Sequence, residues 1–223
     1  MTGSIAQQAA KAAADCDPAI VHVIDDDPSV REGIADLLQS VDVEARTYAA
    51  AHEFLDGVRP DAPGCLVLDV RLPGLSGLEV QRELVRSGVE LPIIFLTGYA
   101  DVPMSVDAMK SGAVEFLTKP FRQQVLLEAI QHATDRDRAR RREIAGIADL
   151  RRRHAELTPR EREVMAEVVL GQLNKQIAFA LGLAEVTVKI HRGRVMRKMK
   201  AKSVVELARM ADTLAAAQRR GES

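Results

Sequence analysis

Cysteine is scarce in this sequence. The 223 residues include only two cysteines, Cys16 and Cys65. Two cysteines cannot make a disulfide framework, and Cys65 stands within an apolar run, where a buried free thiol is the ordinary interpretation. The sequence therefore indicates a reducing compartment and not a fold held together by disulfides.

Long apolar runs are missing as well. No stretch approaches the roughly 20 apolar residues that a membrane-spanning helix needs. The first residues, MTGSIAQQAAKAAADCD, have neither the basic start nor the continuous apolar centre of a signal peptide. We expect residues 1–18 to form a loose tail on a cytoplasmic protein that has no membrane partner.

The chain has almost no net charge, -1 at pH 7, but its two ends differ. Residues 1–122 hold 10 Lys and Arg against 19 Asp and Glu, whereas residues 156–223 hold 13 against 8. Residues 123–155 are also basic, with 8 against 5. A basic C-terminal part indicates contact with a polyanion, although a surplus of this size also fits an ordinary solvated surface.

Residues 19–133 alternate short apolar runs with amphipathic stretches. The expected strands are AIVHVI, VEARTY, CLVL, PIIFLT and VEFLT, and the expected helices start at Pro28, lie near 50–57, 77–87 and 102–111, and start at about 122. Five strands that alternate with five helices predict an α/β domain. Its sheet should be parallel and doubly wound, as in flavodoxin, with helices on both faces.

Only helical periodicity follows from residue 157, interrupted by LGQLN and LGLAE. This pattern predicts a small all-α domain at 157–215 and a short tail at 216–223. The charged residues 134–156 between the two domains could be a flexible linker. They could also extend the preceding helix, with Ile144, Ile147 and Leu150 along one side, and the pattern favours the helix.

Polar residues end the expected strands. Asp25 and Asp26 follow the first, Asp69 the third, Thr97 the fourth and Lys119 the fifth. Ligands of open parallel sheets bind beyond the carboxyl ends of the strands, where the strand order reverses, and for the order 2-1-3-4-5 the three aspartates meet there. Close carboxylates repel one another unless a cation lies among them, and an all-oxygen site favours Mg²⁺.

Each of these features has an ordinary structural interpretation by itself. DDDP is most often a solvated turn that caps a helix, and TG and KP are common turn dipeptides. Their joint occurrence, each at the carboxyl end of its own strand and in the correct order, favours a functional site.

With these residues the chain resembles the receiver domain of two-component response regulators over residues 19–133. The matching segments are VIDDD, LVLDVRLPGLSGLEV, IIFLTGYAD and AVEFLTKPF. The resemblance implies that Asp69 is the phosphoacceptor. It implies that Mg²⁺ is held by Asp25, Asp26, Asp69 and the backbone carbonyl of Arg71.

The same resemblance assigns the remaining polar residues. Thr97 and Lys119 would contact the phosphoryl oxygens, Phe116 would be the switch aromatic, and the Lys119–Pro120 peptide would be cis. Family members dimerise through the surface that corresponds to residues 102–117. Tyr99 stands where this subgroup often has histidine.

Phosphoryl transfer suits these residue types. It needs an in-line nucleophile and positive charge near the equatorial oxygens, which Asp69 and Lys119 with Mg²⁺ would supply. An aspartate-nucleophile phosphohydrolase is the alternative from another class. Such enzymes usually carry a second aspartate two residues after the nucleophile as the general acid, and here that position is Arg71. We therefore do not expect an enzyme.

The C-terminal domain begins with a clear helix signal and continues with two helices. LTPRERE offers Thr158 as N-cap and Glu161 at N3, which together form a capping box. NKQIAFALGLAEVTVKIHRGRVMRKM then predicts a helix, a tight turn at Gly182 and a second helix. The second helix has Val188, Val195 and Met199 on its buried side. A basic helix after a short turn is typical of DNA recognition in the major groove, although an amphipathic helix with solvated cations is the plain alternative.

These residues resemble the LuxR-type helix-turn-helix domain over about 156–215, and both domains together resemble the FixJ branch of NarL/FixJ response regulators. The resemblance places the helix at 185–199 in the groove. The predicted DNA contacts are Thr187, Lys189, Ile190, Arg192, Arg194, Arg197 and Lys198.

Three positions depart from the family pattern. Leu173 and Ala184 stand where relatives often have serine caps, and Gly193 stands where a relative can have a base-contacting side chain. Asn174 could cap its helix one residue late. Site preference therefore does not transfer from the family.

Taken together, the residues and the two resemblances imply a DNA-binding transcription regulator that a sensor histidine kinase activates by phosphorylating Asp69. The implied partners are that kinase, double-stranded DNA, a second copy of the chain after phosphorylation, and RNA polymerase. A regulator that works by protein contact without DNA is the other alternative.

Overall fold

The computed structural model describes residues 18–57, 62–98 and 112–221. The chain divides into two compact units, Met1–Arg141 and Arg142–Ser223. Residues 1–17 of the tail predicted at 1–18, the predicted helix at 102–111 and Tyr99 lie outside the described residues. None of the described helices is both long and apolar enough to cross a bilayer.

A parallel sheet forms the centre of the first unit. Its strands are β1 (Ile20–Ile24), β2 (Glu44–Tyr48), β3 (Gly64–Asp69), β4 (Ile93–Thr97) and β5 (Glu115–Thr118). Their order is β2-β1-β3-β4-β5, and every neighbouring pair is parallel. The predicted doubly wound α/β fold is therefore confirmed, together with its strand order.

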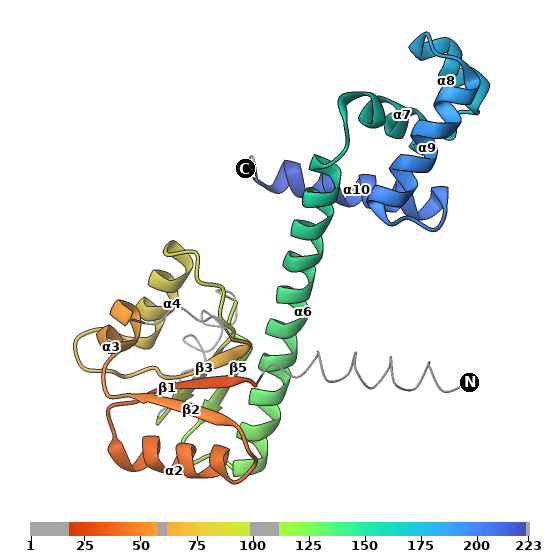
Figure 1. Cartoon of the computed structure of the whole chain (residues 1–223). Coiled ribbons are helices and arrows are strands. Elements are labelled where there is room, and N and C mark those ends of the chain that lie inside the picture. The colour runs from red at the N-terminus through yellow and green to blue at the C-terminus, as the bar shows by residue number, and fades with distance from the viewer. Residues whose placement is uncertain (1–17, 58–61, 99–111, 222–223) are drawn as a thin grey trace, which may run out of the picture. The chain divides into compact units, whose positions relative to one another are not determined.

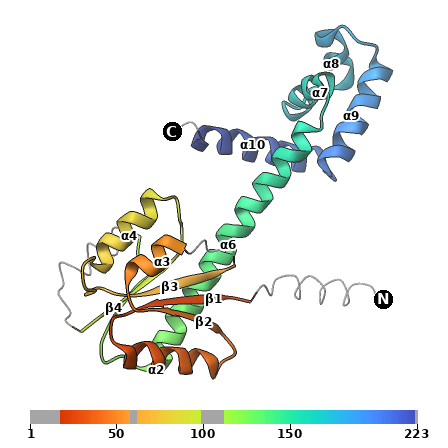
Figure 2. The same ribbon diagram turned by 60° about the vertical axis from the view of Figure 1, so that its left-hand side comes forward.

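Helices cover both faces of this sheet, as Figures 1 and 2 show. α2 (Pro28–Gln39) and α6 (Gln123–Ala155) pack on one face, and α3 (Ala51–Gly57) and α4 (Gly77–Arg86) pack on the other. Successive side chains of a strand point to opposite faces, so Val67 joins the core under α2 and α6, and Leu68 joins the core under α3 and α4. Continuous apolar runs are what a sheet buried on both faces requires.

Local signals in the sequence fix where these helices begin. Asp27 caps α2, because its side chain accepts a hydrogen bond from the Ser29 N–H at 2.8 Å. Ser76 and Glu79 form a capping box at the start of α4. The first residue of α4 is Gly77, where a Cβ atom would lie 2.5 Å from the backbone oxygen of Asp69. Glycine there lets α4 start close against the end of β3.

A buried carboxylate links α6 to the start of β3 through hydrogen bonds. Asp137 is fully buried, and its two oxygens accept hydrogen bonds from Arg140 Nη2 at 2.7 Å and Arg141 Nε at 2.6 Å. The Gly64 N–H at the start of β3 also donates to Asp137, at 3.2 Å, and Arg140 reaches Glu90 at 2.8 Å. One carboxylate thus connects the helix to β3, and through Arg140 to the loop before β4.

We expect Asp137→Ala to lower the free energy of unfolding of the first unit by about 2–3 kcal/mol, because it leaves two guanidinium groups without their buried partner. The loss should stay below the upper range for buried pairs, since the Arg140 and Arg141 side chains are 32% and 27% exposed. Urea denaturation followed by circular dichroism measures it. Asp135→Ala, two residues earlier at an exposed ion pair, is the matched control and should cost under about 0.5 kcal/mol. Equal losses of unfolding free energy in the two variants would contradict the role of Asp137.

The second unit is helical. It contains the end of α6, then α7 (Pro159–Val169), α8 (Asn174–Leu181), α9 (Glu185–Met199) and α10 (Val204–Gly221). The predicted capping box is present: Thr158 Oγ1 accepts from the Glu161 N–H, and Glu161 accepts from the Thr158 N–H. Gly182 ends α8 at φ 64°, a conformation that glycine adopts without steric cost. These features confirm the predicted all-α region with its helix, turn and helix.

The structure decides between the two alternatives for the linker and extends the last helix beyond its predicted end. The charged residues after 134 are helical through Ala155, as part of α6. α10 continues to Gly221, past residue 215 where the pattern placed the end of the domain. Burial explains the extension, because Leu214 and Ala217 are almost fully covered.

Candidate functional site

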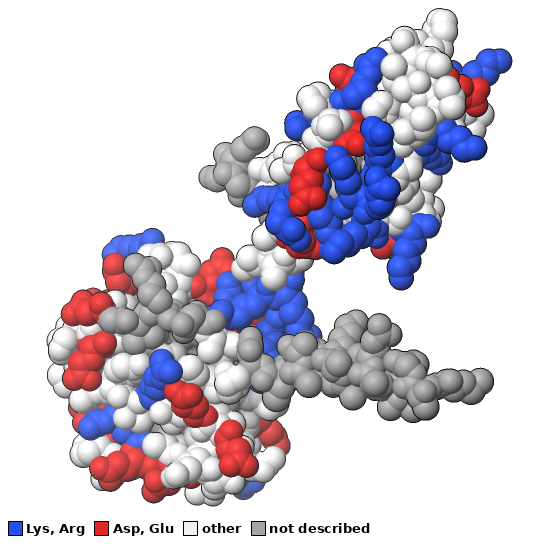
Figure 3. Space-filling model, viewed as in Figure 1, with Lys and Arg blue, Asp and Glu red and all other residues white. Residues whose placement is uncertain are grey.

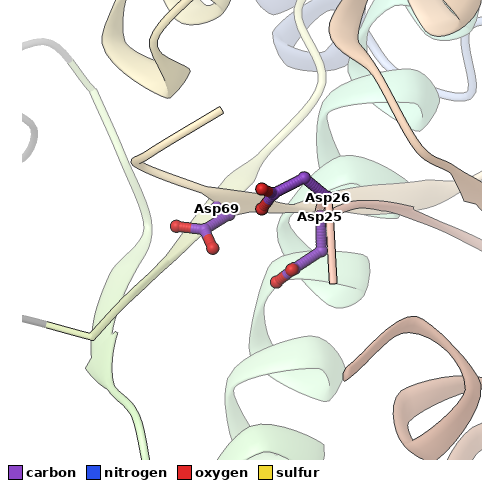
Figure 4. Close-up of side chains that lie close together, drawn as sticks. All are labelled: Asp25, Asp26 and Asp69. Carbon is purple, nitrogen blue, oxygen red and sulfur yellow. The ribbon is translucent and has the colours of Figure 1, made fainter. Parts of the chain in front are cut away.

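Three aspartates gather at the carboxyl edge of the sheet, and Figure 4 shows how they lie. Asp69 is the last residue of β3 and 7% exposed, whereas Asp25 follows β1 and is fully buried. The register pairs Ile24 with Leu68, so the next residue of each strand meets its neighbour at this edge. Oxygen atoms of Asp25, Asp26 and Asp69 all lie within 4.8 Å of one another. The structure thus brings together the carboxylates that the sequence singled out.

Backbone and side-chain hydrogen bonds hold the acidic loop after β1. Asp25 Oδ1 accepts from the Asp27 N–H at 3.0 Å. The Arg31 guanidinium donates to the backbone oxygen of Asp25 at 2.7 Å. After β3, the Arg71 N–H donates to Asp69 Oδ1 at 2.9 Å, so the Arg71 backbone also lies at the site.

Lys119 bridges two of the carboxylates. Its Nζ donates to Asp25 Oδ2 at 2.5 Å and to Asp69 Oδ2 at 2.6 Å. The Lys119–Pro120 peptide is cis, as the resemblance to receiver domains implied. Burial lowers the pKa of Lys119, but its hydrogen bonds to Asp25 and Asp69 outweigh that effect and raise it. Lys119 is therefore a permanent cation at neutral pH.

Burial raises the pKa of Asp25, although the hydrogen bond from Lys119 opposes that rise. Lys119 brings one positive charge to three carboxylates, so the cluster keeps an excess of negative charge when all three are ionised. A divalent cation would balance that excess. The oxygen-only donor set fits Mg²⁺, which prefers carboxylates and water.

Thr97 and Phe116 lie on the neighbouring strands. Thr97 is the last residue of β4 and almost fully buried, and its backbone oxygen accepts from the Lys119 N–H at 2.6 Å. Phe116 lies on β5, partly buried, with its ring centroid 6.2 Å from that of Phe95. Of the predicted dimerising surface at 102–117, the structure describes residues 112–117.

The residues of α9 separate into a buried and an exposed side. Val188, Val195 and Met199 are fully buried, as the sequence predicted. Among the predicted DNA contacts, Lys189, Ile190, Arg194 and Arg197 are exposed, and Thr187, Arg192 and Lys198 are partly exposed. In the view of Figure 3, acidic side chains predominate on the first unit, and basic side chains are concentrated on the second.

Two of the predicted DNA contacts already have partners within the second unit. Arg192 Nη1 donates to Asn174 Oδ1 at 3.0 Å. Lys198 Nζ donates to Glu161 at 2.6 Å and to the backbone oxygen of Glu156 at 2.9 Å. The hydrogen bond from Lys198 is the main cause that lowers the pKa of Glu161. A DNA contact from either cation would have to compete with these partners.

The prediction that Asn174 caps α8 is wrong. Asn174 is the first residue of the helix, and Leu173 occupies the N-cap position without a side-chain hydrogen bond. A capping oxygen must come from the N-cap residue to reach the next free N–H groups, and the Asn174 oxygen accepts from Arg192 instead. The start of α9 also lacks a side-chain cap, as Ala184 predicted.

Three contacts in the structure were not predicted from the sequence: the hydrogen bond from Arg31 to the acidic loop, the Arg192–Asn174 hydrogen bond and the Lys198–Glu161 ion pair. The last two join residues that are 18 and 37 positions apart, so no local pattern reports them. Arg31 did leave a local signal, because a cation in the first turn of a helix opposes the helix dipole.

Comparison with known proteins finds a matching family for each of the two units. Residues 21–131 match the family model of the response regulator receiver domain, and residues 155–211 match that of bacterial regulatory proteins of the luxR family. Nodulation protein W of Bradyrhizobium diazoefficiens is 53% identical over 88% of this chain and 86% of its own length. The transcriptional regulatory protein FixJ of Azorhizobium caulinodans is 44% identical over 86% of this chain and 90% of its own.

Solved structures give the same result. The response regulator StyR is similar with a TM-score of 0.81 and 44% identity, over 87% of this chain and 98% of StyR. Relatives at this level of identity and coverage share the whole two-domain organisation. The chain therefore belongs to the NarL/FixJ family of two-component response regulators, as a transcription regulator with a receiver domain and a LuxR-type DNA-binding domain.

Proposed function

We propose that this regulator is switched on when a sensor histidine kinase transfers a phosphoryl group to Asp69. The observation that carries the proposal is the arrangement at the carboxyl edge of the sheet, where Lys119 bridges Asp25 and Asp69 beside Asp26. A carboxylate at the edge of the sheet supplies a nucleophile, and a fixed ammonium supplies positive charge where the phosphoryl oxygens would lie.

The phosphoryl group would be transferred in a single displacement at phosphorus. An oxygen of Asp69 forms a bond to phosphorus as the bond between phosphorus and the histidine nitrogen of the kinase breaks, and the imidazole leaves. Lys119 stays protonated and shifts its donors toward the phosphoryl oxygens, and Thr97 contributes its hydroxyl. Asp25, Asp26, Asp69 and the backbone carbonyl of Arg71 would hold Mg²⁺, which supplies further positive charge to the same oxygens.

The response would then pass to the second unit through pairing of two chains. We propose that Thr97 moves toward the phosphoryl group and that Phe116 turns inward, which alters the surface at 102–117. Two chains joined there would present two copies of α9 to a two-fold DNA site, and RNA polymerase would be recruited next to it. The exposed cations of α9 support this reading.

Selection of genomic DNA fragments by the purified protein tests the proposal, with and without a small phosphodonor and Mg²⁺. We expect one sequence motif to be enriched, and more strongly after treatment with the donor. No enrichment under either condition would contradict DNA binding and favour a regulator that works by protein contact.

The exposed side of α9 leads to a separate prediction. Lys189→Ala should weaken DNA binding for all sequences and reduce the slope of log affinity against log salt by about 1, because one phosphate contact is lost. Arg209→Ala removes the same charge at an exposed position of α10 and should leave the slope unchanged. Val188→Ala should instead lower the unfolding free energy of the second unit by about 1–2 kcal/mol, since Val188 is fully buried. Thermal melts and salt titrations measure the two effects, and a melt that collapses for Lys189→Ala would refute the assigned face.

A further inference from the structure

Arg31 is placed where helix chemistry disfavours a cation. α2 begins at Pro28, and Asp27 caps it, so Arg31 lies in the first turn. The partial positive charge of the helix N-terminus repels a guanidinium at this position. A residue that violates a local rule of stability next to a candidate site marks a place where function can outweigh stability.

The contact of Arg31 explains its position. Its Nη1 donates to the backbone oxygen of Asp25 at 2.7 Å, and the side chain is partly buried. Over residues 18–57, 62–98 and 112–221, Arg31 forms no ion pair with a carboxylate. Its positive end is thus directed to the main chain of the acidic loop and not to an acidic side chain.

That backbone oxygen belongs to the peptide that joins Asp25 to Asp26. Because a peptide is planar, fixing its oxygen fixes the direction in which the chain enters Asp26. The two carboxylate oxygens of Asp25 are held separately, by the Asp27 N–H and by Lys119. Asp26 is exposed, and among the described residues Arg31 supplies the side-chain bond that orients the peptide leading to it.

We propose that Arg31 is a positioning residue for the metal site, which holds the Asp25–Asp26 peptide in the orientation that lets both carboxylates bind one Mg²⁺. This inference rests on the proposed function of the site. It goes beyond that proposal by assigning the preorganisation of the acidic loop to a side chain of α2 that does not itself touch the metal.

The direction in which the Mg²⁺ affinity changes when Arg31 is removed distinguishes a positioning role from simple charge balance. A cation near a metal site repels the metal, so if Arg31 only balanced the carboxylates, its removal would tighten Mg²⁺ binding. If Arg31 positions the loop, its removal weakens binding, because the loop must then be ordered when the metal binds.

Calorimetric titration of the full-length protein with MgCl₂ makes this measurement. We expect Arg31→Ala to weaken Mg²⁺ binding by at least about tenfold, which corresponds to the loss of one charge-assisted hydrogen bond. Arg31→Lys keeps a cationic donor and should recover part of the affinity. Arg86→Ala, at an exposed arginine on α4 that pairs with Glu83, is the control of equal charge and should bind like the native chain.

Melting curves in EDTA accompany the titrations and show whether each variant is folded without metal. Unchanged or tighter Mg²⁺ binding by a folded Arg31→Ala protein would overturn the positioning role alone. A native chain that takes up no Mg²⁺ would overturn the proposed metal site itself, together with this inference. Weaker binding in Arg31→Ala with partial recovery in Arg31→Lys would support it.

Discussion

Asp69→Asn is expected to abolish the incorporation of phosphate from a phosphohistidine kinase or a small phosphodonor. The amide has nearly the shape of the carboxylate, and its oxygen can still accept from Lys119, so the fold should survive. What is lost is the anionic oxygen that would attack phosphorus, and the neutral amide that takes its place is not a nucleophile. The expected effect is a fall to the background of the assay.

Mass spectrometry of the labelled protein locates the phosphate and gives the result. Asp56→Asn is the matched control, because Asp56 is exposed on α3, and this variant should be labelled at the native rate. EDTA should suppress labelling of the native chain, since it removes the cation that the three carboxylates would hold. Labelling of Asp69→Asn at the native rate, at another residue, would refute the assignment of the phosphoacceptor.

Phosphorylation is expected to convert a monomer into a dimer and to raise the affinity for an inverted-repeat DNA site by at least about tenfold. One small domain with one recognition helix binds DNA weakly, and joining two of them makes the second binding event intramolecular. The surface that we propose for pairing, 102–117, includes residues 115–117 of β5, and Lys119, which directly follows β5, reaches the site.

Sedimentation velocity of both forms, followed by DNA titrations at several salt concentrations, measures this coupling. Affinity should fall steeply with salt in both forms, because most contacts would be to phosphates. Asp69→Asn treated with the same phosphodonor is the control and should stay monomeric. Equal dimerisation and equal affinity with and without phosphate would reject the coupling, and would point to a dimer that forms in both states.

The elements of the fold could be predicted because their signals are local. Apolar runs such as IIFLT mark strands that are buried on both faces, and Thr158 with Glu161 marks the start of a helix within four residues. The convergence of Asp25 and Asp69 could also be predicted. It requires only that β1 and β3 are parallel neighbours, so that their carboxyl ends meet at one edge.

The sequence by itself thus determined the architecture, the identity of the acidic cluster and the buried side of α9. Tertiary structure alone decided which polar groups satisfy one another. Lys119 reaches Asp25 across 94 positions and Asp69 across 50, and Arg192 occupies the Asn174 oxygen that local rules assign to a cap. The physical reason is that a hydrogen bond depends on distances of about 3 Å between side-chain ends. Such distances are set by the register of strands and the packing of helices, and propensity and periodicity, which act over a few residues, carry no information about them.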